Sequence, residues 1–218
     1  MNQPTETETV RSYLENLRGR LRRADSVPRP APGTEKKSAA VLLPLLRHGD
    51  ELHLVYTRRS DHLASHRGQV AFPGGRFDRR DPHLLAAALR EAYEEIGLEP
   101  QSVEVLGSFK SYRTHSTKIL VTPFVGVVRG APALRADPKE VAEIFEVPLP
   151  ALRDKHFRGY HDWRDNGYAT RRPAIIYGGQ TIWGLTYSLT LAFLGLSMVE
   201  VAQRESRSSV SQARRASS

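Results

Sequence analysis

Three glutamates in the middle of the chain are spaced so that they would share one face of an α-helix. Glu91, Glu94 and Glu95 stand at positions i, i+3 and i+4, and side chains at these spacings are neighbours on a helix surface. Like charges placed in this way repel each other by roughly 0.2–0.5 kcal/mol per pair. A hard divalent cation with oxygen ligands, Mg²⁺ or Mn²⁺, would offset that repulsion, and such cations commonly bind substrate phosphates as well. The triplet therefore indicates metal-dependent phosphate chemistry, and a solvated acidic face is the alternative.

The segment around these glutamates has the signals of a helix that can dock on a sheet. Asp81 is a good N-cap, Pro82 suits the first helical position, and Gly97 provides a C-terminal stop. We therefore expect a helix that begins after Asp81, buries an apolar stripe and presents its carboxylates to a cleft. The residues of that stripe recur at helical spacing: Leu85, Ala88, Leu89, Ala92 and Ile96.

Glycines and cationic residues precede this predicted helix. Gly74 and Gly75 allow the backbone to approach a ligand closely and to adopt positive φ angles. Arg58 and Arg59 could bind phosphate, because guanidinium groups bind it bidentately, or they could simply end a strand in solvent. His66 could contact substrate or serve as a structural hydrogen-bonding residue. The cations in this region are Arg58, Arg59, His66, Arg67 and Arg76.

The glycine turn and the glutamate helix together resemble a known signature. Nudix hydrolases, which use Mg²⁺ to cleave a nucleoside diphosphate linked to another moiety, carry a motif similar to Gly75 followed by Arg90-Glu91-x-x-Glu94-Glu95-x-Gly97-Leu98. The resemblance implies an α/β fold, the Nudix-type α/β/α sandwich with a mixed β-sheet between helices. The chain departs from the motif at two points. The glycine stands one residue early, and Pro82 occupies the position of a further glutamate.

Three more segments are similar to the coenzyme A pyrophosphatase branch of that family. They are residues 54–75, ending in Phe72-Pro73-Gly74-Gly75, residues 137–149, and Ile182-Trp183-Gly184-Leu185-Thr186. This similarity implies an enzyme dependent on Mg²⁺ (or Mn²⁺) that cleaves coenzyme A, or its oxidised or acylated forms, to phosphopantetheine and 3′,5′-ADP.

The resemblance also implies roles for individual residues. Glu91 and Glu95, assisted by Glu94, would hold the metal, and either Glu91 or Glu140 would be the general base. Glu140 could instead be an acidic first-turn residue of a short helix. The residues expected to bind substrate are Arg58, His66, Gln69, Gly74, Gly75 and Arg76.

Two other functions stay open. The chain could be a Nudix hydrolase for another nucleoside diphosphate derivative, such as ADP-ribose, NADH or a capped RNA, although residues 54–75 argue against this. It could also be a catalytically silent Nudix-like binding module, which only the absent early acid supports. A turnover assay distinguishes the three possibilities.

Composition limits the remaining options. The 218 residues include no cysteine, which excludes disulfides and thiolate metal sites and fits a cytoplasmic protein. No apolar run is long enough for a membrane helix. The net charge of +8 lies mostly in the terminal segments, so the body of the chain is not expected to read nucleic acid. We expect a small-molecule nucleotide substrate and a monomer or homodimer.

The pattern of apolar, proline and glycine residues predicts three regions: an N-terminal helical and proline-rich extension (1–35), a Nudix hydrolase domain (36–202) and a disordered basic tail (203–218). Because the extensions are charged, we expect neither to join the core, and residues 34–202 to fold and keep their kcat. Helices are expected at 7–25, 139–145 and 181–199. Strands are expected at 39–46 and 52–57, joined as a hairpin, and at 103–110, 120–128 and 174–177.

Overall fold

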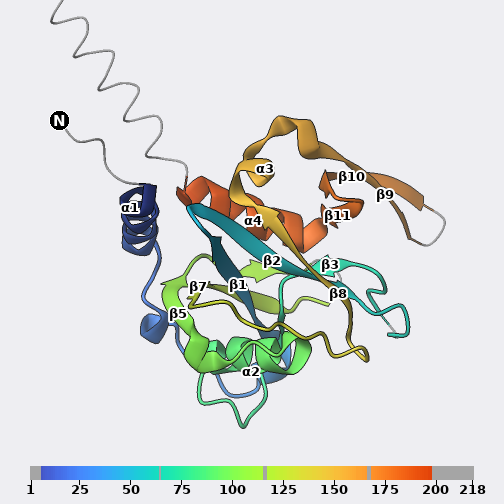
Figure 1. Cartoon of the computed structure of the whole chain (residues 1–218). Coiled ribbons are helices and arrows are strands. Elements are labelled where there is room, and N and C mark those ends of the chain that lie inside the picture. Colours follow the sequence, from blue (N-terminus) through green and yellow to red (C-terminus); the bar gives the residue numbers. More distant parts are fainter. Residues whose placement is uncertain (1–5, 64, 115–116, 166–167, 198–218) are drawn as a thin grey trace, which may run out of the picture.

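The structure, a computed structural model, describes residues 6–63, 65–114, 117–165 and 168–197. In this part of the chain eight strands form one mixed sheet and three strands form a second, smaller one (Figure 1). The helices are α1 (Glu6–Arg20), α2 (Leu84–Ile96), α3 (Leu149–Arg153) and α4 (Gly184–Ser197). The strands are β1 (Ser38–His48), β2 (Glu51–Arg59), β3 (Val70–Ala71), β4 (Gly74–Arg76), β5 (Val103–Ser108), β6 (Tyr112–Arg113), β7 (Leu120–Val128), β8 (Val141–Pro148), β9 (Arg158–Asp165), β10 (Tyr168–Tyr177) and β11 (Gln180–Trp183).

The large sheet is built on the predicted hairpin of β1 and β2. Its central order is β3-β2-β1-β7-β5, while β4 pairs with β1, β6 with β7 and β8 with β2. The β1 and β7 strands run parallel, and the other pairs are antiparallel. The β1 strand is apolar over almost its whole length because both faces of the sheet are covered there.

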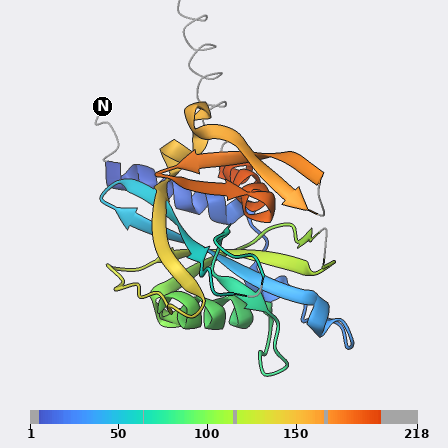
Figure 2. The same ribbon diagram turned by 90° about the vertical axis from the view of Figure 1, so that its right-hand side faces the viewer.

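Helices cover the two faces of the large sheet, as Figures 1 and 2 show. On one face, small and apolar residues of α2 pack against the sheet in a cluster that includes Ala88, Ala92, Leu42 and Phe124. On the other face, α4 and α1 pack in a second cluster with the small sheet. The expected α/β/α arrangement around a mixed sheet is confirmed. No helix in the described residues is long and apolar enough to cross a membrane.

The first helix corrects one expectation. Val10 and Leu17 of α1, and Leu21 just after it, are 6%, 1% and 9% exposed and belong to the main hydrophobic cluster. After α1 the chain adds a two-way backbone contact, since Arg22 and Ser108 exchange N–H···O bonds of 2.8 Å. The expectation that the N-terminal segment takes no part in the core is therefore wrong for α1. The predicted tail at 203–218 lies outside the described residues.

A second correction concerns residues 139–145, which we expected to form a short helix. Residues 139 and 140 form a turn, and residues 141–145 belong to β8, an edge strand paired antiparallel with β2. Val141, Ile144 and Phe145 are β-branched or aromatic and fit a strand. The expected helix at 181–199 is also shorter, because Gln180–Trp183 pair with β10 as β11 and α4 begins at Gly184. Strands β3, β4, β6, β9 and β11 were not predicted.

Candidate active site

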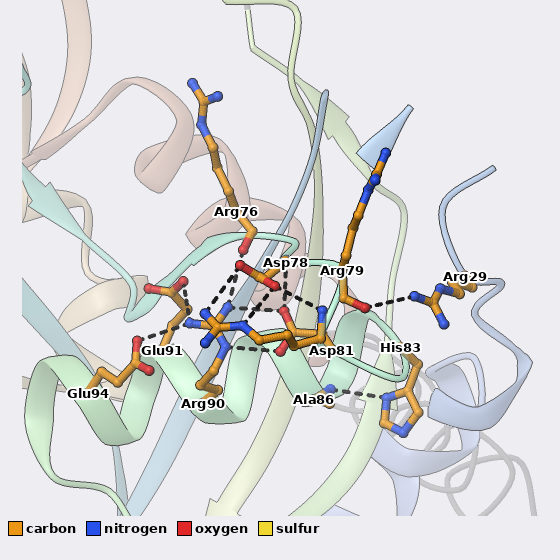
Figure 3. A network of polar contacts seen from close by, with 11 residues as sticks. Arg29, Arg76, Asp78, Arg79, Asp81, His83, Ala86, Arg90, Glu91 and Glu94 are labelled. Carbon is orange, nitrogen blue, oxygen red and sulfur yellow. Dashed lines mark hydrogen bonds and ion pairs between the residues drawn. The ribbon is translucent and has the colours of Figure 1, made fainter. Parts of the chain in front are cut away.

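The side chain of Arg90 on α2 collects four carboxylate contacts (Figure 3). Its Nε and Nη2 atoms donate to the two oxygens of Asp81 at 2.9 and 3.0 Å. Its Nη1 atom donates to Glu91 at 2.9 Å and to Glu94 at 3.0 Å. The bidentate contact with Asp81 fixes the plane of the guanidinium. Arg90 thus fixes the positions of Glu91 and Glu94, two of the three predicted glutamates.

Asp81 has a different role from the one expected. Helix α2 begins at Leu84, and its N-cap is His83, whose ring accepts a hydrogen bond from the Ala86 N–H at 3.0 Å. Asp81 is instead buried next to Arg90. Burial alone would raise the pKa of its carboxyl group, but the hydrogen bonds from Arg90 and from the Asp78 N–H lower this pKa below its usual value. Asp81 therefore supplies an acid beside the position that Pro82 leaves without one.

Glu95 is the most buried carboxylate of the triplet, at 3% exposure. One of its oxygens accepts the Gly74 N–H at 3.1 Å, and the other lies 3.7 Å from Nη1 of Arg59. Burial raises the pKa of Glu95 to about 7, against the opposing effects of the Gly74 N–H and the Arg59 guanidinium. A carboxylate that is buried and has only one cation near it, at 3.7 Å, favours binding of a further cationic ligand.

Glu91 lies against the glycine turn. Burial is also the main reason why the pKa of Glu91 is raised. A Cβ atom built on Gly75 would stand 2.3 Å from Cδ of Glu91, so any larger residue would displace the carboxylate. At Gly74, where φ is +150°, a Cβ would stand 2.4 Å from the carbonyl oxygen of Ala40. The two glycines are thus required both by the path of the backbone and by the space that the carboxylates occupy.

These residues fit a hard divalent cation. Glu91 and Glu95 are desolvated oxygen donors, and burial raises the pKa of each against the hydrogen bonds from Arg90 and Gly74. Glu94 is more exposed, with 53% of its side chain accessible, and is tied to Arg90. Glu91 and Glu95 would hold such an ion, with Glu94 on the solvent side. When bound, the ion would lower the pKa of a water molecule and neutralise charge on phosphate oxygens.

Glu140 approaches the same carboxylates from the loop before β8. Its backbone N–H donates to the Asp137 carbonyl at 3.0 Å, while the Asp137 N–H donates to the carbonyl of Glu95 at 3.0 Å. The Glu140 carbonyl in turn accepts the N–H of Ser60 at 2.8 Å. Its negative charge adds to burial in raising the pKa values of Glu91 and Glu95. The side chain of Glu140 is exposed, so the acid is near the site and accessible to solvent; its role as general base stays a prediction.

The two neighbouring arginines of β2 point to opposite faces of the sheet. Arg59 lies on the α2 side, next to Glu95. Arg58 lies on the other side, where its Nε donates to Glu143 at 3.3 Å, and Gln180 of β11 donates to the same oxygen of Glu143 at 2.8 Å. Sequence reasoning selected Arg58 and omitted Arg59 from the site. The alternation of side chains along a strand could have separated the two, because apolar Val55 shares the α2 face with Arg59.

The other predicted substrate-binding residues form a tight loop and a turn. Between β2 and β3, Nδ1 of His66 lies 2.9 Å from Oε1 of Gln69, and the backbone of Arg59 bonds to Gly68 and Gln69 in both directions. Arg76 is exposed, and its carbonyl oxygen accepts a hydrogen bond from Arg90 at 3.3 Å. Its guanidinium points away from the carboxylate network (Figure 3). His66 and Gln69 are therefore one local unit, and Arg76 is separate from the carboxylates.

Comparison with known proteins shows which family the chain belongs to. The family model described as "NUDIX domain" matches residues 36–166. The chain is 42% identical over 153 residues to the "Uncharacterized Nudix hydrolase NudL" of Photorhabdus laumondii, covering 70% of this chain and 81% of that protein. The protein of the same name from Yersinia enterocolitica is 41% identical over 164 residues, or 73% and 83% of the two chains. A crystal structure of a NUDIX hydrolase from Alicyclobacillus acidocaldarius matches with a TM-score of 0.49 and 17% identity, over 76% of this chain and 94% of that one. The protein therefore belongs to the Nudix family and is a Nudix hydrolase.

Proposed function

We propose that the protein is a Mg²⁺- or Mn²⁺-dependent pyrophosphohydrolase that cleaves coenzyme A, or its oxidised or acylated forms, to phosphopantetheine and 3′,5′-ADP. The observation that carries the catalytic part is the pair of desolvated carboxylates, Glu91 and Glu95, held against the Gly74–Gly75 turn. The substrate assignment depends on the resemblance of residues 54–75, which run from β2 through the His66–Gln69 loop directly into that turn.

Hydrolysis needs an attacking water, a proton acceptor and stabilisation of the charge that develops on the phosphates. Water attacks one phosphorus of the pyrophosphate in line, and the bridging P–O bond breaks so that each product keeps one phosphate. Glu91 or Glu140 accepts the proton of the water. Arg59 presents a cation beside Glu95, and its Nε is a buried donor without a hydrogen-bond partner among the described residues. That donor is suited to an anionic phosphate oxygen.

The Asp81–Arg90 pair favours an enzyme over a silent binding module. The silent alternative was supported only by the acid absent at Pro82. Asp81 provides an acid one residue away, and it orients Arg90, which in turn contacts Glu91 and Glu94. We find no comparable observation that favours ADP-ribose, NADH or a capped RNA as the substrate.

Product analysis tests the proposal directly. Purified protein with Mg²⁺ is incubated separately with coenzyme A, acetyl-coenzyme A, ADP-ribose and NADH, and the products are separated by chromatography. We expect phosphopantetheine and 3′,5′-ADP from coenzyme A at a higher kcat/KM than for the other nucleotide classes. A preference for ADP-ribose or NADH would refute the substrate assignment, and the absence of turnover with all four would support the silent module.

The neighbouring arginines provide a matched pair of variants. If Arg58 contacts substrate, Arg58→Ala should reduce kcat/KM for coenzyme A by roughly 10- to 100-fold, the loss expected for one charge-assisted contact. Arg59→Ala removes the cation next to Glu95 and should act mainly on kcat and on the Mg²⁺ dependence. An unchanged kcat/KM for Arg58→Ala would remove this residue from the site and leave the substrate assignment intact.

A further inference from the structure

A second cluster of potential metal ligands lies at the far end of the β1–β2 hairpin. His48 ends β1, His53 lies near the start of β2, and Glu146 lies on β8. One ligand atom from each lies within 4.8 Å of the other two. Arg59 lies six positions after His53 on β2, which is about 20 Å along a strand. The cluster is therefore distinct from the carboxylates of α2.

Strand register brings these side chains onto one face of the sheet. Leu46 pairs with His53 and His48 with Glu51, while Val55 pairs with Glu146. Residues two apart in a strand share a face. His48, His53 and Glu146 therefore share the face that α2 covers farther along, and Glu51 lies on it too.

The contacts of His53 are difficult to satisfy without a cation. Its Nδ1 lies 3.5 Å from an oxygen of Glu146, and its Nε2 lies 3.7 Å from an oxygen of Glu51. The Nε2 atom is buried and has no hydrogen-bond partner among the described residues. A neutral imidazole has one N–H and one lone pair, so one carboxylate always faces a lone pair. The same Glu146 oxygen also lies 2.6 Å from Nε2 of His48. Three electron-pair donors thus converge from three strands.

We infer that His48, His53 and Glu146 form a binding site for a transition-metal ion, with Zn²⁺ the best fit. Two imidazoles and a carboxylate match the ligands of Zn²⁺, which binds them at about 2.0–2.2 Å in a tetrahedron. This geometry sets neighbouring donors about 3.3 Å apart, compared with 2.6 Å from His48 Nε2 and 3.5 Å from His53 Nδ1 to the same oxygen of Glu146. The ion would take the Nδ1 of His53 and leave its Nε2–H for Glu51, a carboxylate that fixes the ring of the ligand. The exposed fourth position would be open to water.

Such an ion would tie the β1–β2 hairpin to the edge strand β8. It would join the hairpin to a strand whose Glu146 is 98 positions from His48 in sequence, and it would bind the folded chain only. Zn²⁺ should therefore raise the Tm of the full-length protein. The site has no part in the hydrolysis proposed above, so kcat with Mg²⁺ should be the same whether or not His48 is replaced.

Metal titrations of the full-length protein test the inference. With Mg²⁺ in excess to occupy the α2 site, Zn²⁺ is titrated against a chromophoric chelator, and Co²⁺ binding is followed by its visible absorption. We expect one Zn²⁺ per chain at high affinity and a tetrahedral Co²⁺ spectrum. His48→Ala, at an exposed position, and His53→Ala should each weaken Zn²⁺ binding by at least about 10-fold, and Glu51→Gln by about 10-fold. Glu146→Gln should abolish the tetrahedral spectrum.

His156→Ala is the matched control, because it removes an exposed histidine of another segment and should leave Zn²⁺ affinity unchanged. Circular dichroism checks that each variant is folded, and the exposed His48 keeps the test valid if His53→Ala unfolds. Wild-type protein that binds no Zn²⁺ at micromolar concentrations would overturn the inference, as would equal affinity in wild type and His48→Ala.

Discussion

Replacing Glu95 with glutamine should make the metal-free protein more stable at high pH while removing most of its activity. Glu95 is 3% exposed, and burial raises the pKa of its carboxyl group from 4.5 to about 7. Keeping it ionised in the folded state above pH 7 costs about 3 kcal/mol, at 1.36 kcal/mol per pKa unit. Glutamine has a similar size and no charge, and its side-chain oxygen can still accept the Gly74 N–H.

The direction of this pH-dependent change in stability follows from proton binding by Glu95. Between pH 4.5 and about 7, the folded protein retains a proton on Glu95 that the unfolded chain has released. Stability from this group is complete below pH 4.5 and is lost as pH rises through about 7. The glutamine variant cannot ionise at this position, so its stability does not fall in this pH range for this reason. The free energy of unfolding should therefore be similar for both proteins near pH 4.5, and greater for the variant by up to about 3 kcal/mol at pH 8.

Urea unfolding in EDTA at pH 5 and pH 8 measures this difference, followed by circular dichroism. Saturating Mg²⁺ should reduce or reverse the difference at pH 8, because wild type binds the ion more tightly. Turnover of the variant should fall by about 10²-fold, which corresponds to roughly 3 kcal/mol of barrier. Glu94→Gln is the control, because the side chain of Glu94 is 53% exposed and removing its charge relieves no burial cost. A stability difference equal at both pH values, or a less stable variant at pH 8, would refute the reasoning.

Three more outcomes follow from the structure. Asp81→Asn removes a charged partner of Arg90 and should destabilise the fold by about 2–3 kcal/mol and lower kcat, as urea unfolding and initial rates would measure. Leu17→Ala should cost about 2–5 kcal/mol in urea unfolding, because this α1 residue is 1% exposed in the core; no change would support a dispensable extension. Gly75→Ala should raise the Mg²⁺ concentration for half-maximal activity by about 10-fold, because the added methyl displaces Glu91, and an unchanged Mg²⁺ dependence would contradict that geometry.

The sequence was informative wherever one local rule decided the outcome. The i, i+3, i+4 spacing predicted the carboxylate face of α2, and Gly97 ends the helix with φ of +66° as expected. It was less informative where a contact depends on how two separate elements pack against each other. The Asp81–Arg90 pair required the turn before α2 to fold back on the helix, and β8 formed because β2 offered it an open edge.

The sequence was similarly limited in assigning Arg58 or Arg59 to the site. Both residues are cationic and adjacent, so composition and motif could not separate them. Side-chain alternation along β2 shows that the two arginines face opposite ways, but which of them faces Glu95 and which faces Glu143 depends on where α2 packs. The same holds for α1, whose few apolar residues indicate burial only once the position of α4 is known.

The contact between α1 and α4 constrains how the chain is made. Arg20 donates to the carbonyl of Leu196 at 2.9 Å across 176 positions of sequence. During synthesis α1 leaves the ribosome before α4 is made, because the 176 positions between Arg20 and Leu196 take roughly 10–35 s at about 5–20 residues per second. For that interval Val10, Leu17 and Leu21 lack the α4 surface that helps to bury them. Nascent chains should therefore depend on chaperones until residues 184–197 emerge, and truncation within α4 should leave the first helix sensitive to proteases.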